Sequence, residues 1–398
     1  MPPSQAIAVT PSLLVWARQE SGYAPAIVAK RLQVQEHRLL AWESGERQPT
    51  FKQVENLARV LHRPLSVFFL PEPPRLPPLA AEYRRLPGVE PGHETPEFRL
   101  AVRQMVARRA HTLNLMGELG DDVPLFALRA HLSERPADVG RRLRAAIGVD
   151  TATQFGWHDG YRAWAAWRAA IERLGVLVFQ FGKVKLEEAR GVALFHAQLP
   201  AIGINGKEIP EAKAFTAFHE VVHLMLAAGH EETSALKDRR TDTEWTKVEQ
   251  FAEIAASHAL VPEDSLHQLM RQQTLTAASP WDVEQVRLVA RRFKLTPSAT
   301  ATRLRAAGFM SRPSYERWRA DWDAYVAALP PRRGGIATPA QKAVNKAGRP
   351  FAQLVLEALS ANRLTAVEAS RYLDLKFEHF DKLREHLSTS PGDLALDG

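Results

Sequence analysis

The stretch 215–226 constrains the fold of this chain more than any other. It is an apolar run that holds two histidines four residues apart, His219 and His223, with Glu220 next to the first. On a helix of about 3.6 residues per turn, positions four apart lie on one face, so both imidazoles can reach one ion. Pro210 precedes the run at a place that suits the first turn of a helix. The sequence therefore predicts a buried helix with a metal-binding face.

The spacing of these residues is the HExxH pattern of zinc peptidases, in which the glutamate accepts a proton from the attacking water. The alternative interpretation is that His219 and His223 are core histidines bonded to backbone or carboxylate groups. Two imidazoles and a carboxylate on one buried helix edge are costly without a partner, which favours the metal site. Manganese or iron also suits two imidazoles and a carboxylate, and zinc is preferred on geometry.

A catalytic zinc needs a third protein ligand. The stretch 249–262 offers two carboxylates four residues apart, Glu249 and Glu253. Small residues between and after them predict a second helix that packs closely on the first: Ala252, Ala255, Ala256 and Ala259. On spacing alone, either carboxylate could be the ligand.

The two stretches together resemble the ImmA/IrrE family of metallopeptidases. The resemblance rests on Lys213-Ala-Phe-Thr-Ala-Phe-His-Glu-Val-Val-His and on Glu249-x-x-Ala252-x-x-x-Ala256-x-x-x-Leu260-Val-Pro262. It implies that Glu249 is the third zinc ligand and that Glu253 occupies a position where the family usually has Asn or Asp. It also implies a zincin-like fold and a protein substrate, a helix-turn-helix repressor whose cleavage switches on stress or mobile-element genes.

The sequence does not single out a stabiliser for the oxyanion of peptide hydrolysis. The candidates are Tyr161, His196, His230, Arg240 and His258. A structural or exposed role is the favoured interpretation for each. His258, nine residues beyond Glu249, is the candidate that we would test first.

Residues 1–71 are expected to form a separate unit of five short helices. The segments 39–51 and 54–61 resemble the XRE class of helix-turn-helix domains, whose second helix lies in the DNA major groove. The resemblance implies base-facing and phosphate-facing residues at Gln35, Glu36, His37, Arg38, Ala41 and Arg47, a double-stranded DNA partner, and a homodimer that reads paired half-sites. The unit has only 8 Lys/Arg against 5 Asp/Glu, so a role in protein contacts or dimerisation is the alternative.

Proline density divides the rest of the chain. We expect a connector at 72–98, a peptidase domain at 99–328, a second linker at 329–337 and a small helical C-terminal domain at 338–398. Strands are predicted only near the metal motif, at 175–181, 191–195 and 200–205, and the last is expected to be the edge strand that holds an extended substrate. The predicted fold class is therefore mainly α with a small β-sheet (α+β).

Composition excludes several classes of protein. The absence of cysteine rules out disulfides and thiolate metal sites. No apolar stretch reaches the roughly 20 residues that span a bilayer, and the first residues do not read as a leader, so a cytoplasmic protein without a membrane partner is expected. The net charge of +7 is compatible with nucleic acid but does not establish binding.

These observations favour a zinc-dependent endopeptidase joined to a DNA-binding domain. One alternative is a transcriptional regulator whose zincin domain is a sensor or is latent. A third hypothesis is an antitoxin-like regulator.

Overall fold

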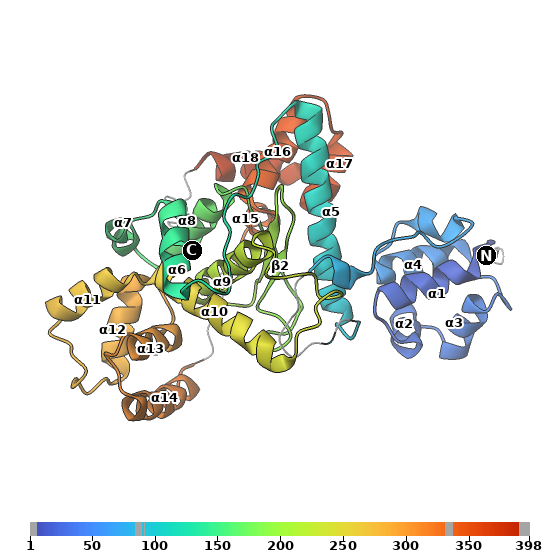
Figure 1. Ribbon diagram of the computed structural model, residues 1–398. Helices are drawn as coiled ribbons and strands as arrows, with labels where there is room; N and C mark the ends of the chain where they lie inside the picture. Colours follow the sequence, from blue (N-terminus) through green and yellow to red (C-terminus); the bar gives the residue numbers. More distant parts are fainter. Residues whose placement is uncertain (1–5, 84–89, 91, 331–336, 390–398) are drawn as a thin grey trace.

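The computed structural model describes residues 6–83, 90, 92–330 and 337–389. Over these residues the chain is mainly helical with one small sheet, which confirms the predicted fold class (Figure 1). The predicted linker at 329–337 and the end of the predicted C-terminal unit, 390–398, fall largely outside the described residues, as do 84–89 and 91 in the first connector.

The elements before the sheet are α1 (Pro11–Glu20), α2 (Pro25–Leu32), α3 (Glu36–Glu43), α4 (Phe51–Leu61), η1 (Leu65–Phe69), η2 (Leu79–Ala81), α5 (Pro96–Leu119), α6 (Pro136–Ile147), α7 (Thr151–Gly156) and α8 (Gly160–Glu172). The strands are β1 (Leu177–Phe181), β2 (Gly191–Leu194) and β3 (Ala201–Asn205). The elements after the sheet are α9 (Pro210–Ala228), α10 (Asp242–Leu260), α11 (Glu263–Gln272), α12 (Val283–Phe293), α13 (Pro297–Ala306), α14 (Arg312–Ala327), α15 (Pro339–Ala347), α16 (Arg349–Ser360), α17 (Ala366–Leu373), η3 (Phe377–His379) and α18 (Phe380–Ser388).

The sheet has the strand order β1-β3-β2, with β1 parallel and β2 antiparallel to β3. All three predicted strands form, but the expectation that 200–205 is an edge strand is wrong. Because β3 is hydrogen-bonded to a strand on each side, it has no free edge for a substrate, and the two edges belong to β1 and β2. Both β2 and β3 pack on α9, and residues of β2 line the cleft at the metal motif.

Both faces of the sheet are covered by helices. Side chains alternate along each strand, so Phe179 and Leu194 pack with α5 on one face while Val178 and Ile202 pack with α8 and α9 on the other. Every residue of the three strands is buried, as expected for a sheet between two helical layers. The sheet therefore forms a rigid base beneath α9.

The helix α10 lies between α9 and α6. Gly140 of α6 is required at this contact, because a Cβ atom there would lie 2.4 Å from the carbonyl oxygen of Ala255. The small residues of α10 thus allow close packing with α6 as well as with α9. This packing fixes the position of Glu249 relative to the metal motif.

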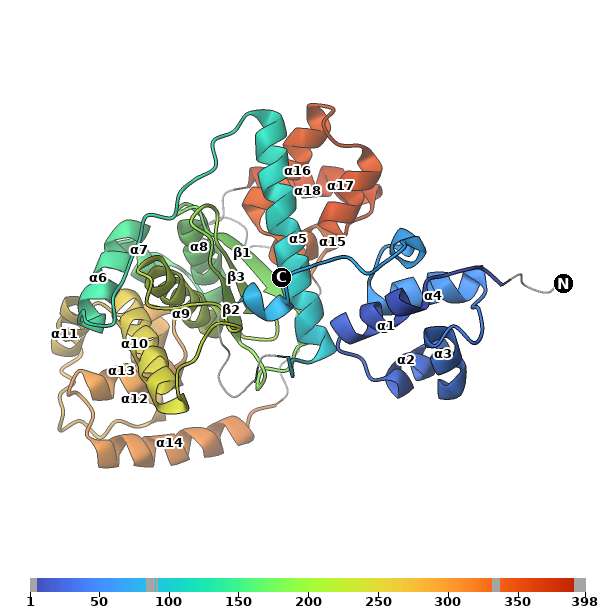
Figure 2. The same ribbon diagram turned by 45° about the vertical axis from the view of Figure 1, so that its right-hand side comes forward.

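The helix α5 joins the parts of the molecule that lie outside this core. The N-terminal helices α1–α4 have a hydrophobic cluster of their own and lie near the first turns of α5, and α15–α18 pack beside α5 farther along (Figure 2). The cluster of the C-terminal helices includes Leu115 of α5. The first predicted connector also ends earlier than expected, because α5 begins at Pro96.

Among the described residues, no helix combines the length and the apolar character needed to cross a bilayer.

Candidate metal centre

The helix α9 carries the metal motif along its most buried side. Pro210 occupies its first turn, and the apolar run that follows packs between the sheet and α10, so that His223 is only 4% exposed and Glu220 only 8%. His219 is partly exposed and faces the same cleft. The prediction of a buried helix over this stretch is confirmed.

Three side chains converge at this face. The Nε2 atoms of His219 and His223 lie 2.9 Å apart, and the two oxygens of Glu249 lie 3.3 Å from them, Oε2 from His219 and Oε1 from His223. Their donor atoms all lie within 4.8 Å of one another. The structure therefore brings together the three residues that the sequence analysis proposed as ligands.

This donor set fits a zinc ion. Tetrahedral zinc with ligands at roughly 2.0–2.2 Å holds its donor atoms about 3.3 Å apart, close to the separations seen here. Two imidazoles and one carboxylate leave a fourth coordination place open, as catalytic zinc sites do. Although burial alone would raise the pKa of Glu249, its contacts with His219 and His223 lower that pKa, so the carboxylate is ionised and ready to bind a cation.

The residue Glu232 also belongs to this centre and was missed in the sequence. Its Oε1 atom lies 2.7 Å from Nδ1 of His223, and its side chain is only 1% exposed. A carboxylate on Nδ1 leaves Nε2 of the imidazole free to bind a metal and fixes the orientation of the ring. Because Glu232 lies in the loop after α9, no helical spacing relates it to the motif, and only its proximity in sequence to the end of the helix could have drawn attention to it.

Glu220 lies in the same cleft beside the ligands. Burial raises its pKa to about 7, and the attraction of His223 and His219 offsets only part of that increase. The outer strand β2 passes so close that a Cβ atom on Gly191 would lie 2.4 Å from Oε1 of Glu220. A glycine at the start of β2 thus leaves room for the carboxylate that the sequence analysis assigned as the base.

The cleft has a volume of about 360 Å³ and lies between the strand β2 and the helices α9 and α10. Its walls are the segment 186–193, Phe215, Thr216 and the residues of the metal centre. Glu253 is exposed and lines the cleft without belonging to the three-residue donor group. Of the two carboxylates that spacing left open, only Glu249 therefore meets both histidines.

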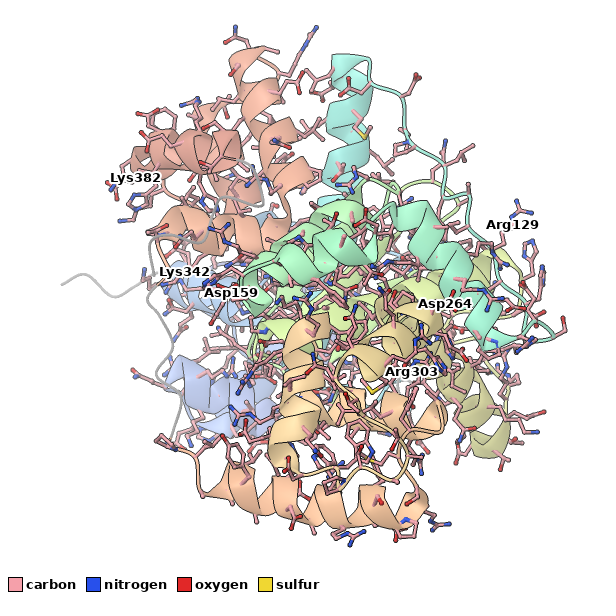
Figure 3. The ribbon with its side chains drawn as sticks, turned by 90° about the vertical axis from the view of Figure 1, so that its left-hand side faces the viewer. Arg129, Asp159, Asp264, Arg303, Lys342 and Lys382 are labelled. Atoms are coloured by element: carbon pink, nitrogen blue, oxygen red, sulfur yellow. The ribbon has the colours of Figure 1, made fainter. Side chains whose placement is uncertain are left out.

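None of the five oxyanion candidates is among the described residues that line the cleft. His258 lies at the far end of α10, where its Nδ1 atom is 3.3 Å from Nη2 of Arg303. Arg303 on α13 is labelled in Figure 3. Tyr161 is 69% exposed on α8, and Arg240 donates a hydrogen bond to the carbonyl of Glu231. His196 lies near Glu82, and His230 lies in the turn after α9.

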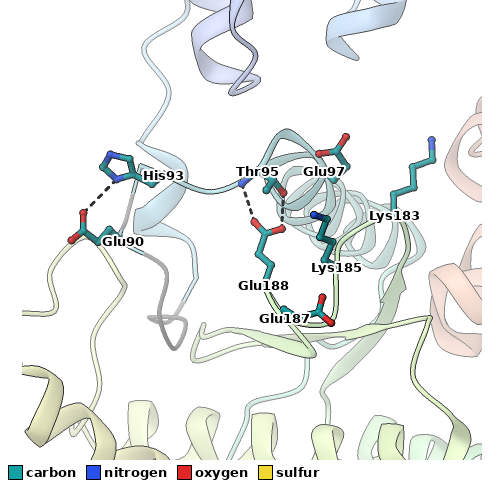
Figure 4. Close-up of a pocket in the computed structure, with 8 residues that line it drawn as sticks. All are labelled: Glu90, His93, Thr95, Glu97, Lys183, Lys185, Glu187 and Glu188. Carbon is teal, nitrogen blue, oxygen red and sulfur yellow. Dashed lines mark hydrogen bonds and ion pairs between the residues drawn. The ribbon is translucent and has the colours of Figure 1, made fainter. Parts of the chain in front are cut away.

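A second hollow of about 760 Å³ adjoins the cleft on the other side of the segment 186–190. Figure 4 shows Glu188 of this segment bonded to the first residue before α5: the backbone N of Thr95 donates to Oε1 at 2.9 Å, and its hydroxyl donates to Oε2 at 2.7 Å. The wall of the cleft is thereby attached to α5. Glu187 and Glu188 line both the cleft and the hollow.

The residues assigned to DNA contact lie directly before α3, on α3 and in the turn after it. Gln35, Glu36, His37 and Arg38 are exposed, as is Arg47, whereas Ala41 is partly buried. The helices α2 and α3 are joined through Gln33 in the left-handed conformation, and α3 is held to α1 by two bonds from Arg18 to Glu43, at 2.6 and 2.8 Å. This leaves one side of α3 open to solvent.

Comparison with known proteins gives one finding for the region around the metal centre. No curated protein matches the chain. The family model described as the IrrE N-terminal-like domain, a peptidase family, matches residues 171–305. The match begins in α8, ends in α13 and includes the sheet, both metal-bearing helices and Glu232. Residues 171–305 are thus similar to metallopeptidase-like domains of the ImmA/IrrE type.

Proposed function

We propose that this protein is a zinc-dependent endopeptidase. The observation that carries the proposal is the convergence of His219, His223 and Glu249 on one point, with Glu220 buried beside them in an open cleft. The match of residues 171–305 to a peptidase family supports the same chemistry.

Zinc, when bound by these three residues, lowers the pKa of water toward neutrality and polarises the carbonyl of the peptide. Glu220 accepts the proton of the attacking water and returns it to the leaving nitrogen. Burial raises the pKa of this carboxyl to about 7 before any metal is bound, and a general base works best when its pKa lies near the operating pH. Glu232 holds His223 in the orientation that binds the metal.

The strand β2 supports the assignment of an endopeptidase. Residues 191–193 line the cleft at the outer edge of the sheet, where an extended segment of a protein substrate can add as a further strand. Main-chain pairing of this kind does not need a free chain end.

The proposal extends to the N-terminal helices. We infer that α3 contacts double-stranded DNA, since it is the second of two short helices joined by a tight turn and its outer side is exposed. In such an arrangement a DNA-bound helix-turn-helix repressor is the substrate, and its cleavage derepresses stress or mobile-element genes.

The test compares the purified full chain with Glu220→Gln. Both proteins are expected to hold one equivalent of zinc, while Glu220→Gln lowers cleavage of a repressor by at least about 10²-fold. Glu118→Gln, an exposed change at the end of α5, is the matched control and should cleave normally. Zinc-loaded Glu220→Gln that cleaves at the wild-type rate would disprove the assignment.

The DNA contact is tested separately. Arg38→Glu is expected to weaken binding of the full chain to operator DNA and to leave peptide cleavage unchanged. Equal DNA binding by Arg38→Glu and the wild type would contradict a DNA-facing α3.

A further inference from the structure

Arg190 is the one lysine or arginine among the described residues that line the cleft. The other ionisable groups on its walls are two histidines and five glutamates, of which Glu187 and Glu253 are exposed. A divalent metal ion bound by His219, His223 and Glu249 would already supply positive charge at that end of the cleft. The position of Arg190 at the start of β2 calls for a separate explanation.

The guanidinium group of Arg190 is held from one side only. Its Nη1 atom donates to Oε1 of Glu208 at 3.1 Å. The side chain of Glu208 is 1% exposed, whereas that of Arg190 is 64% exposed. The other guanidinium nitrogens have no hydrogen-bond partner within the part of the chain that the structure describes, so the outer edge of the group faces solvent.

Glu208 in turn connects Arg190 to the helix that carries the base. Its Oε2 atom accepts a hydrogen bond of 2.8 Å from the hydroxyl of Thr216, which lines the cleft one helical turn before Glu220. Glu208 thus fixes the guanidinium at the end of the cleft that lies on the N-terminal side of Glu220. One turn of helix is about 5.4 Å, or roughly two residues of extended peptide.

We propose that Arg190 is a specificity-determining residue that binds a carboxylate of the substrate about two residues from the scissile bond. An arginine with a free edge presents two parallel N–H donors that match the two oxygens of a carboxylate. Such charge-assisted hydrogen bonds are stronger than those between neutral groups. The carboxylate comes from an Asp or Glu side chain in an internal segment or from the C-terminus of the peptide. This inference rests on the proposed peptidase function.

Cleavage of a random peptide library by the zinc-loaded full chain tests the inference. We expect Asp and Glu to be enriched within about two residues of the cleaved bond. Arg190→Glu should lose that enrichment and favour Lys or Arg instead, and Arg190→Lys should keep a weaker preference for acids. For one acidic peptide and its Gln counterpart, the preference should appear as an approximately tenfold or larger change in KM with kcat changed less than about threefold.

Two arms separate the sources of the carboxylate. The library is prepared once with free and once with amidated C-termini. Enrichment that persists in amidated peptides assigns the carboxylate to a side chain, and enrichment that needs the free terminus assigns it to the chain end. Lys207→Glu is the matched control, because it makes the same charge change next to Glu208 outside the cleft and should leave the profile unchanged.

An unchanged cleavage profile in Arg190→Glu would overturn the inference. If the wild type cleaves no peptide, the proposed function fails, and the role of Arg190 is decided by fluorescence anisotropy with the zinc-loaded chain. The acidic peptide should then bind at least about tenfold more tightly than its Gln counterpart. This preference should be seen only in proteins that have Arg or Lys at position 190. Equal binding of the two peptides would also overturn it. Arg190→Gln replaces Arg190→Glu if reversal of the charge prevents folding.

Discussion

At the scale of single residues, the metal centre depends on carboxylates with different surroundings. Glu249 keeps an ionised carboxylate toward the candidate metal position because two imidazoles face it, whereas burial raises the pKa of Glu220 to about 7. Glu232 contacts no metal position and acts through His223 alone. All three side chains are glutamates, and their different surroundings give each of them a different role.

Glu232→Ala is expected to weaken zinc binding by about 10–100-fold, because His223 loses the acceptor that orients its ring. Glu232→Gln keeps a carbonyl oxygen that can accept from Nδ1, so its effect should be smaller. Competition with a zinc chelator measures both affinities. The neighbouring Glu231→Gln is the control, and a zinc affinity of Glu232→Ala equal to that of the control would rule out this role.

His258 gives the molecule a dependence on pH that is separate from the metal centre. Burial, together with the charge of Arg303, lowers the pKa of His258 from 6.5 to about 4. The unfolded chain therefore binds a proton at this residue between pH 6.5 and pH 4 while the folded chain does not, so the contribution to stability is lost as the pH falls through this window.

Between pH 7 and pH 4.5, we expect the free energy of unfolding to decrease in the wild type by more than it does in His258→Gln. The difference between the two decreases should be roughly 1–3 kcal/mol. Urea titrations at the two pH values measure the difference. His37→Gln, on the exposed side of α3, should behave like the wild type. Parallel pH profiles for His258→Gln and the wild type would show that the buried imidazole does not contribute.

At the scale of elements, the position of α10 determines whether the centre forms. The helix must approach α9 closely enough for Glu249 to meet both histidines, and α6 holds it there from the other side. Gly140 makes that approach possible, since a Cβ atom would meet the backbone of Ala255 and Ala259. Backbone atoms cannot move aside as the end of a flexible side chain can.

Gly140→Ala is expected to destabilise the protein by about 1–3 kcal/mol through overpacking against α10. Gly117→Ala is the matched control in α5, where a Cβ atom meets nothing within 4 Å, and should stabilise by about 0.5–1 kcal/mol because alanine favours the helix. Thermal unfolding compares the two. A stabilising effect of both substitutions would contradict the close contact between α6 and α10.

The sequence predicted those features that depend on local spacing. The histidines of α9 share a face because they are four residues apart, and glycine or proline bounds the three short strands. The order of the strands depends on pairing between distant residues, which is why β3 was expected at an edge although it lies in the centre. Glu232 and the link between Arg190 and Glu208 were missed for the same reason, because loops bring these side chains together without a regular period.

At the scale of the whole molecule, buried polar contacts join the C-terminal helices to the central sheet and the helix α8. Arg168 of α8 is buried, with Nε 3.1 Å from Oε1 of Glu172. It also donates to the carbonyls of Val178 in β1 and Asn345 in α15. One side chain therefore connects a helix, the sheet and the C-terminal unit.

Arg168→Leu is expected to lower the free energy of unfolding by about 3–5 kcal/mol, because it leaves Glu172 buried without its partner. The C-terminal helices should also become sensitive to limited proteolysis. Arg312→Leu removes an exposed pair with Glu316, at 2.9 Å, and should change the stability far less than Arg168→Leu does. Similar losses of stability in the two variants would argue against the buried connection.

The bonds between Thr95 and Glu188 have a consequence for how this molecule can vary. The same hydroxyl that donates to Glu188 accepts a hydrogen bond from the backbone N of Phe98 and so begins α5. Because both depend on the hydroxyl of Thr95, the first turn of α5 and the segment 186–190 that borders the cleft are expected to loosen together. A change at Thr95 would alter the start of α5 and the width of the cleft together, and neither property could be adjusted while the other stayed fixed.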